Sequence, residues 1–104
     1  MSVYSPDLWV IVEIKNHDSE EAIKKVFASW YGGYLGSDRW KLSSGITEIV
    51  EHDTHYEIHN HSGSIYNCGK QSQGMSGYAG SVLEHMKENT KDRATITVLD
   101  EMKS

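Results

Sequence analysis

Hydrophobic and polar positions alternate along the chain in short blocks, and most of these blocks predict strands. Segment 8–15 (LWVIVEIK) has a β-branched centre, which is typical of a well-buried strand. Segments 46–51 (ITEIVE) and 55–60 (HYEIHN) flank a short polar turn and predict a hairpin. Two further short strands are predicted over 65–68 (IYNC) and 94–99 (ATITVL).

One stretch has the periodicity of an amphipathic helix. Apolar side chains recur at helical spacing from Met75 to Met86, which predicts a helix over 76–88. Gly77 and Gly80 lie inside it, and each costs roughly 1 kcal/mol relative to alanine. We therefore expect these glycines to allow close packing against a strand or against a second chain.

Segment 19–30 allows two interpretations. Its apolar side chains fall at helical spacing, and Asp18 or Ser19 offers an N-cap. The run VFASWY is also good strand material. The pattern favours a helix over 19–30 and leaves a strand as the alternative. With short connections throughout, the elements predict a single α+β domain over 1–104 with a mostly antiparallel sheet.

Composition and charge narrow the classes of function. Apolar residues make up 38% and charged residues 24% of the 104 residues, which is typical of a globular protein. The net charge of −5 argues against general nucleic-acid binding, although a local basic cluster can still hold a small anion. A chain this short gains core by pairing, so we expect a homo-oligomer.

Cysteine content and hydropathy predict the compartment. A single cysteine, Cys68, excludes an intrachain disulfide and favours a reducing environment. No apolar run approaches the roughly 18 residues of a transmembrane helix, and the first residues lack the features of a signal peptide. We therefore expect a cytoplasmic protein with no membrane association.

The stretch 30–45 (WYGGYLGSDRWKLSSG) predicts a binding surface, because glycine allows close backbone approach and flat rings supply rigid contact area. Rings can stack on a base while Arg or Lys holds phosphate, and Ser/Gly turns can present N–H groups and hydroxyls to an anion. The turn at 62–64 and a nearby lysine would complete such a site. The alternative is that both tryptophans lie in the core and the turns are only structural. The candidate ligand-binding residues are Trp30, Tyr34, Arg39, Trp40, Lys41, Ser43, Ser44, Ser62, Ser64 and Lys70.

Evidence for enzyme chemistry is weaker. His55, Glu57, His59 and His61 alternate along one predicted strand, and imidazole with carboxylate suits Zn²⁺. An exposed hairpin face explains the same pattern, so a metal-dependent enzyme that uses His55, His59 and His61 is kept as an alternative. Cys68 ends a short apolar strand and is typical of a small core residue. In the absence of a triad or paired-carboxylate motif, we expect a protein without catalytic residues, metal or cofactor.

Two motifs carry a resemblance. The pattern W-Y-G-G-Y-L-G-S-D-R-W-K-L-S-S-G-I over 30–46, followed by S-G-S-I-Y-N-C over 62–68, resembles small uncharacterised proteins of tailed phages. The resemblance covers roughly 26–82 and brings no assigned activity or functional residue. It implies a small phage protein made in a bacterial cytoplasm.

Small acidic phage proteins often counter host defence, and this class argument shapes the functional hypothesis. We expect a non-enzymatic binder that sequesters an anionic, nucleotide-derived signal. The alternative is an inhibitor that binds a host protein directly through its exposed rings.

Overall fold

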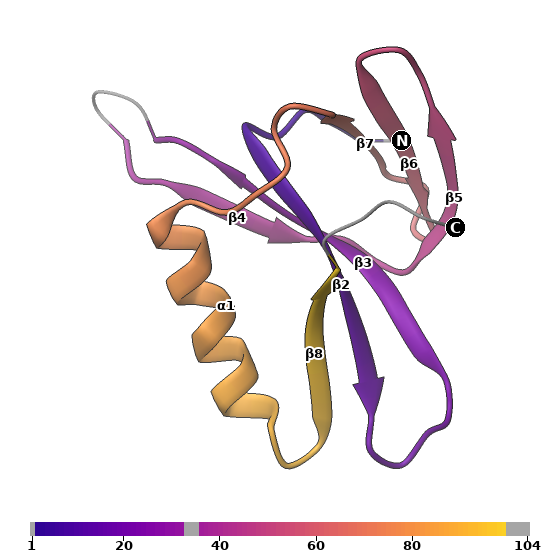
Figure 1. Cartoon of the computed structure of the whole chain (residues 1–104), viewed down its shortest axis with the longest axis vertical. Coiled ribbons are helices and arrows are strands. Elements are labelled where there is room, and N and C mark those ends of the chain that lie inside the picture. The colour runs from indigo at the N-terminus through magenta and orange to yellow at the C-terminus, as the bar shows by residue number, and fades with distance from the viewer. Residues whose placement is uncertain (1, 33–35, 100–104) are drawn as a thin grey trace.

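Strand β2 (Leu8–Asn16) is buried on both of its faces. Trp9, Val10, Ile11 and Val12 are consecutive, so their side chains alternate between the two faces, yet all four are buried. Layers must therefore cover this strand from both sides. The computed structural model, which describes residues 2–32 and 36–99, shows these layers: helix α1 (Gly77–Thr90) and the β5–β7 strands lie on opposite sides of β2 and β3 (Figure 1).

The strands form two four-stranded sheets, which we call the middle sheet and the outer sheet. The order of the middle sheet is β4 (Arg39–Leu42), β3 (Ala22–Trp30), β2 and β8 (Ala94–Leu99), with every pair antiparallel. The order of the outer sheet is β1 (Val3–Tyr4), β7 (Ile65–Gly69), β6 (His55–Asn60) and β5 (Ile46–Glu51). In this sheet β1 is parallel to β7, and the other pairs are antiparallel.

Two apolar cores follow from the alternation along β2. Trp9 and Ile11 point into the core between the two sheets, where they meet Ile58 and Tyr66. Val10 and Val12 point to the other side and pack with side chains of the helix. The helix side contains Phe27, Ala79 and Leu83, with Leu42 and Met86 packed against them. The middle sheet is therefore the central layer of three.

The α+β class with a mostly antiparallel arrangement is confirmed, and so are most of the elements. The predicted hairpin is β5–β6, and the predicted strands at 8–15, 65–68 and 94–99 are β2, β7 and β8. The predicted helix 76–88 is α1, whose N-cap Ser76 accepts a hydrogen bond at Oγ from the Ala79 backbone N–H (3.1 Å). Strands β1 and β4 were not predicted. No helix in the described part of the chain is long and apolar enough to cross a membrane.

The helix favoured over 19–30 is wrong, and the strand alternative is correct. β3 pairs with β2 on one side and with β4 on the other. Val26, Phe27 and Ala28 are consecutive and all buried, because β3 lies beside β2 in the central layer. A strand covered on both faces has a continuous apolar run, and such a run also contains residue pairs at helical spacing.

Glycines in α1 do not pack against a strand of this chain. A Cβ added at Gly77 or Gly80 would meet no described atom within 4 Å. The expected close packing of these glycines on a strand is therefore wrong, whereas packing on a second chain stays a prediction.

We predict that Gly80→Ala raises the free energy of unfolding by about 0.5–1 kcal/mol, because alanine has the higher helix propensity and meets no clash. Chemical denaturation of the two proteins measures the change. Gly63→Ala is the matched control and should destabilise, since Gly63 has φ of +93° in the β6–β7 turn. Destabilisation by Gly80→Ala, or a change of oligomeric state by light scattering, would show instead that this face packs on a second chain.

Candidate ligand-binding groove

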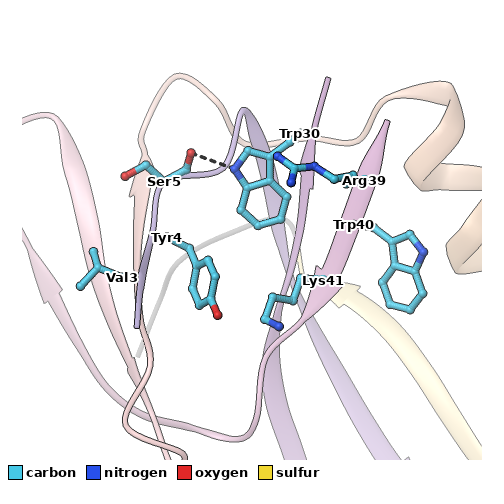
Figure 2. Close-up of a pocket in the computed structure, with 7 residues that line it drawn as sticks. All are labelled: Val3, Tyr4, Ser5, Trp30, Arg39, Trp40 and Lys41. Atoms are coloured by element: carbon cyan, nitrogen blue, oxygen red, sulfur yellow. Dashed lines mark hydrogen bonds between the residues drawn. The ribbon is translucent and has the colours of Figure 1, made fainter. Parts of the chain in front are cut away.

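Two adjoining cavities lie where β1, β4 and the β6–β7 turn approach one another. The first, which we call the aromatic cavity, has a volume of about 370 Å³ and is lined by Tyr4, Trp30, Arg39 and their neighbours (Figure 2). The second, the serine cavity, has a volume of about 390 Å³. Tyr4 and Lys41 line both cavities, so we treat the two as one groove. Each volume lies within the range of small-molecule sites.

A row of three aromatic rings runs along the groove. Tyr4 makes an edge contact with Trp30 (ring centroids 6.2 Å apart) and a closer, tilted contact with Tyr66 (4.9 Å). Pairing of β1 with β7 places Tyr4 opposite Tyr66. The Trp30 indole N–H donates to the Ser5 carbonyl (3.1 Å), which ties the other end of the row to the N-terminal segment (Figure 2).

Two cations lie over these rings. Strand alternation puts Arg39 and Lys41 on the same side of β4, facing Trp30 and Tyr4 (Figure 2). The Arg39 guanidinium carbon is 5.9 Å from the Trp30 ring centroid, and Lys41 Nζ is 5.3 Å from the Tyr4 ring centroid. Neither cation forms an ion pair with a carboxylate in the described ranges.

Two nearby carboxylates do not pair with these cations. They accept hydrogen bonds from backbone N–H groups just after β3 instead. The Asp7 carboxylate accepts from the Tyr31 N–H (2.8 Å), and the Asp38 carboxylate accepts from the Gly32 N–H (2.9 Å). These bonds hold the backbone at Tyr31 and Gly32 and leave the two cations available to a ligand.

The Trp40 ring lies on the opposite side of β4 from Arg39 and Lys41 (Figure 2). It packs near Phe27 (ring centroids 5.8 Å apart), on the helix side of the middle sheet, and remains 41% exposed. Trp40 borders the aromatic cavity through its position in β4, but its ring does not join the row formed by Trp30 and Tyr4.

Four predicted serines line the serine cavity, and one of them is structural. Ser43 is buried; its Oγ accepts from the Val26 N–H (2.8 Å) and donates to the Ser44 carbonyl (2.7 Å). The Ser44 hydroxyl donates to Ser62 Oγ (3.1 Å) and accepts from the Ser62 N–H (3.0 Å). Ser62 and Ser64 share a further hydroxyl bond (3.2 Å). The two Ser/Gly turns that are separate in the sequence are therefore joined in one hydrogen-bonded cluster.

Lys70 lies away from the groove and lines neither cavity. Its Nζ contacts Glu51 Oε2 at 2.6 Å and lies 5.3 Å from the Tyr56 ring centroid. The hydrogen bond to Glu51 raises the pKa of Lys70, so this lysine is held by a partner in the outer sheet. Tyr34, the remaining candidate, falls outside the described residues.

The histidine face of β6 is arranged around Glu57. His59 and His52 both contact the Glu57 carboxylate, and their hydrogen bonds lower its pKa below the usual 4.5. His55 stacks on His52 (ring centroids 4.6 Å apart), whereas His61 lies in the turn after the strand. Within 2–32 and 36–99, no group of three His, Cys, Asp or Glu side chains is placed to hold a metal ion.

Cys68 is in the core between the sheets. Burial raises the pKa of its thiol to about 12, which disfavours the nucleophilic thiolate.

Two aromatic residues of the groove were missing from the predicted set, Tyr4 and Tyr66. β1 is only two residues long, which is too short for a periodic signal. Tyr66 lies inside the S-G-S-I-Y-N-C motif and in a predicted strand, but the sequence pattern does not show that its ring borders a cavity. Comparison of the chain with protein families, with curated proteins and with solved structures finds no match.

We predict that Ser43→Ala lowers the free energy of unfolding by about 1–3 kcal/mol, because the buried Val26 N–H loses its acceptor. Urea denaturation measures the loss. Ser44→Ala is the comparison variant: its half-buried hydroxyl can be replaced by water, so its loss should be smaller. Equal effects of the two variants would contradict a structural role specific to Ser43.

We predict that the Glu57 carboxyl titrates below pH 4.5 in the folded protein, in a carbon-detected NMR titration. Because the folded-state pKa is lowered, the stability gained from the ionised carboxylate is present above the unfolded-state pKa and is lost as pH falls through the folded-state pKa. The difference in urea midpoint between wild type and Glu57→Gln should therefore vanish in acid. Glu20→Gln, which removes an exposed carboxylate outside the described ion pairs, should show no such convergence.

Proposed function

We propose that this chain is a non-enzymatic binding protein. Its ligand is a small, nucleotide-derived anion with a ring system, which it holds in the groove. The observation that carries the proposal is the position and the pairing of the Arg39 and Lys41 side chains. Both lie over aromatic rings at the same groove, and neither is paired with a described carboxylate, in a chain with a net charge of −5.

The chemistry of the groove suits such a ligand. A phosphate gives charge-assisted hydrogen bonds to guanidinium and ammonium groups, and a guanidinium can bind it through two parallel bonds. A nucleobase can stack on Trp30 or Tyr4, a contact worth about 1–3 kcal/mol for each base. The net negative charge of the chain repels long polyanions. A small anionic ligand is therefore a better match for this protein than DNA or RNA.

The lining favours binding over catalysis. Among the described residues that line the two cavities there is no carboxylate, imidazole or thiol. General acid–base and nucleophilic catalysis at neutral pH rely mostly on those groups. A groove of rings, cations and hydroxyls can hold a ligand without converting it, which is the property that sequestration needs.

The resemblance to phage proteins suggests a biological setting for this binding. A phage protein made in quantity in a bacterial cytoplasm would lower the free concentration of a nucleotide signal that activates host defence. We propose this role as an anti-defence sponge from the class of protein, in addition to the chemistry of the groove.

The second candidate, inhibition of a host protein, is favoured by a different observation. Trp40 is half exposed on the opposite side of β4, and Tyr78 is exposed on α1. Exposed aromatic rings are enriched in protein–protein hot spots. Under this alternative, capture of a single stoichiometric partner from bacterial lysate would depend on Trp40 and would be unaffected by changes in the groove.

We predict that wild-type protein binds at least one member of a panel of cyclic nucleotides and ADP-ribose derivatives in titration calorimetry. Arg39→Gln and Lys41→Gln should each weaken that binding by about tenfold or more, because each removes a charge-assisted hydrogen bond. Lys24→Gln removes the same charge from an exposed position of β3 that lines neither cavity, and it should bind as wild type does.

Two outcomes would contradict the proposal. The first is the absence of heat with every member of the panel when the folded wild-type protein is titrated. The second is an equal loss of affinity in Lys24→Gln, which would mean that net charge rather than the groove controls binding.

A further inference from the structure

The serine cluster in the serine cavity contains one hydroxyl proton that the protein does not use. Ser44, Ser62 and Ser64 carry three hydroxyl protons. The Ser44 proton goes to Ser62 Oγ, and the bond between Ser62 and Ser64 uses a second proton. Ser64 Oγ also accepts a hydrogen bond from the Asn60 side-chain amide (3.3 Å). Asn60 supplies the proton of that bond, so it uses none of the three serine protons. The third proton has no acceptor among the described residues and can be donated to a ligand.

Tyr66 supplies a second unused donor to the same cavity. Its side chain is 0% exposed and lines the cavity, and its hydroxyl has no hydrogen-bond partner in the described ranges. Buried polar groups nearly always have a partner, so a hydroxyl that no protein group bonds, on a residue that lines a cavity, is available to a ligand. Burial also raises the pKa of Tyr66 to about 12, so the hydroxyl remains a donor at neutral pH.

Lys41 brings a positive charge to these two donors. It lines both cavities, whereas Arg39 lines only the aromatic one. The serine cavity thus offers one cation together with the spare serine proton and the Tyr66 hydroxyl, and no carboxylate lies among its described lining residues. This donor set matches the oxygens of a phosphate group, which accept hydrogen bonds and carry negative charge.

We infer that the serine cavity is the phosphate subsite of the groove and that the Tyr66 hydroxyl is the donor that makes it specific for phosphate. The inference rests on the proposed function, because it assigns the parts of the same ligand to the two cavities. The ring system lies on Trp30 and Tyr4 beside Arg39, and the phosphate extends past Lys41 to the serine cluster. Because the Tyr66 hydroxyl has no exposed surface in the ligand-free protein, its hydrogen bond to a phosphate oxygen requires a shift of the side chains that cover it.

Calorimetry with adenosine 5′-monophosphate and with adenosine tests the assignment, since the two probes differ only in the phosphate. Wild-type protein should bind the monophosphate more tightly. Tyr66→Phe should weaken monophosphate binding by about tenfold and leave adenosine binding unchanged. Ser64→Ala should act in the same direction. Tyr78→Phe removes a hydroxyl from an exposed tyrosine on α1 and is the matched control, with wild-type affinity for both probes.

Thermal unfolding of the ligand-free proteins separates a binding role from a structural one. Tyr66→Phe should unfold at the wild-type midpoint or higher, because it removes a buried hydroxyl that has no partner. A lower midpoint would show that the hydroxyl has a structural partner, and it would overturn the inference. An equal loss of affinity for both probes, or none for either, would also overturn it.

The two proposals fail in different ways. If folded wild-type protein binds neither probe, the proposed function fails for mononucleotides and the phosphate subsite fails with it. If wild-type protein binds the monophosphate but Tyr66→Phe and Ser64→Ala bind it equally well, only the subsite is wrong and the groove remains a binding site.

Discussion

Burial of β2 on both faces is the constraint on which the rest of this structure depends. Four consecutive apolar side chains, from Trp9 to Val12, need two separate apolar layers. Full burial of one such side chain contributes about 1.5–3 kcal/mol, so leaving either face open would cost a large part of a small domain's stability. The helix covers one face and the outer sheet covers the other. The groove lies at the edge of the contact between the middle and outer sheets, where residues of β1 and β4 line it.

Most of the fold could be predicted from the local sequence pattern. The errors occur where tertiary contacts, and not the local pattern, decide the structure. Segments whose apolar side chains fall on one face, such as β6 and α1, show a clear period and were predicted at nearly their observed bounds. β3 was misassigned because it lies in the central layer, where burial on both faces removes the period of two that identifies a strand. β1 has only two residues and exists through its long-range pairing with β7, which no local pattern encodes.

The candidate site was predicted in composition better than in geometry. Trp30, Arg39, Lys41 and the four serines line one groove, and hydrogen bonds between the two Ser/Gly turns join its serine part. The sequence contains no sign that 39–42 is a strand, so the alternation that turns Trp40 away from Arg39 and Lys41 could not be foreseen. The roles of Ser43 and Lys70 depend on particular partners, Val26 and Glu51, that are distant in sequence.

The pairing of β1 with β7 also sets when the groove can exist during synthesis. Val3 pairs with Ile65, so after β1 has been synthesised about sixty further residues must follow before its partner strand exists. Until β7 is made, the Tyr4 ring lacks its contact with the Tyr66 ring. The wall that the two cavities share is then incomplete. The groove therefore cannot form on the nascent chain before β7 has been made, because one of its walls is built from both ends of this long-range pairing.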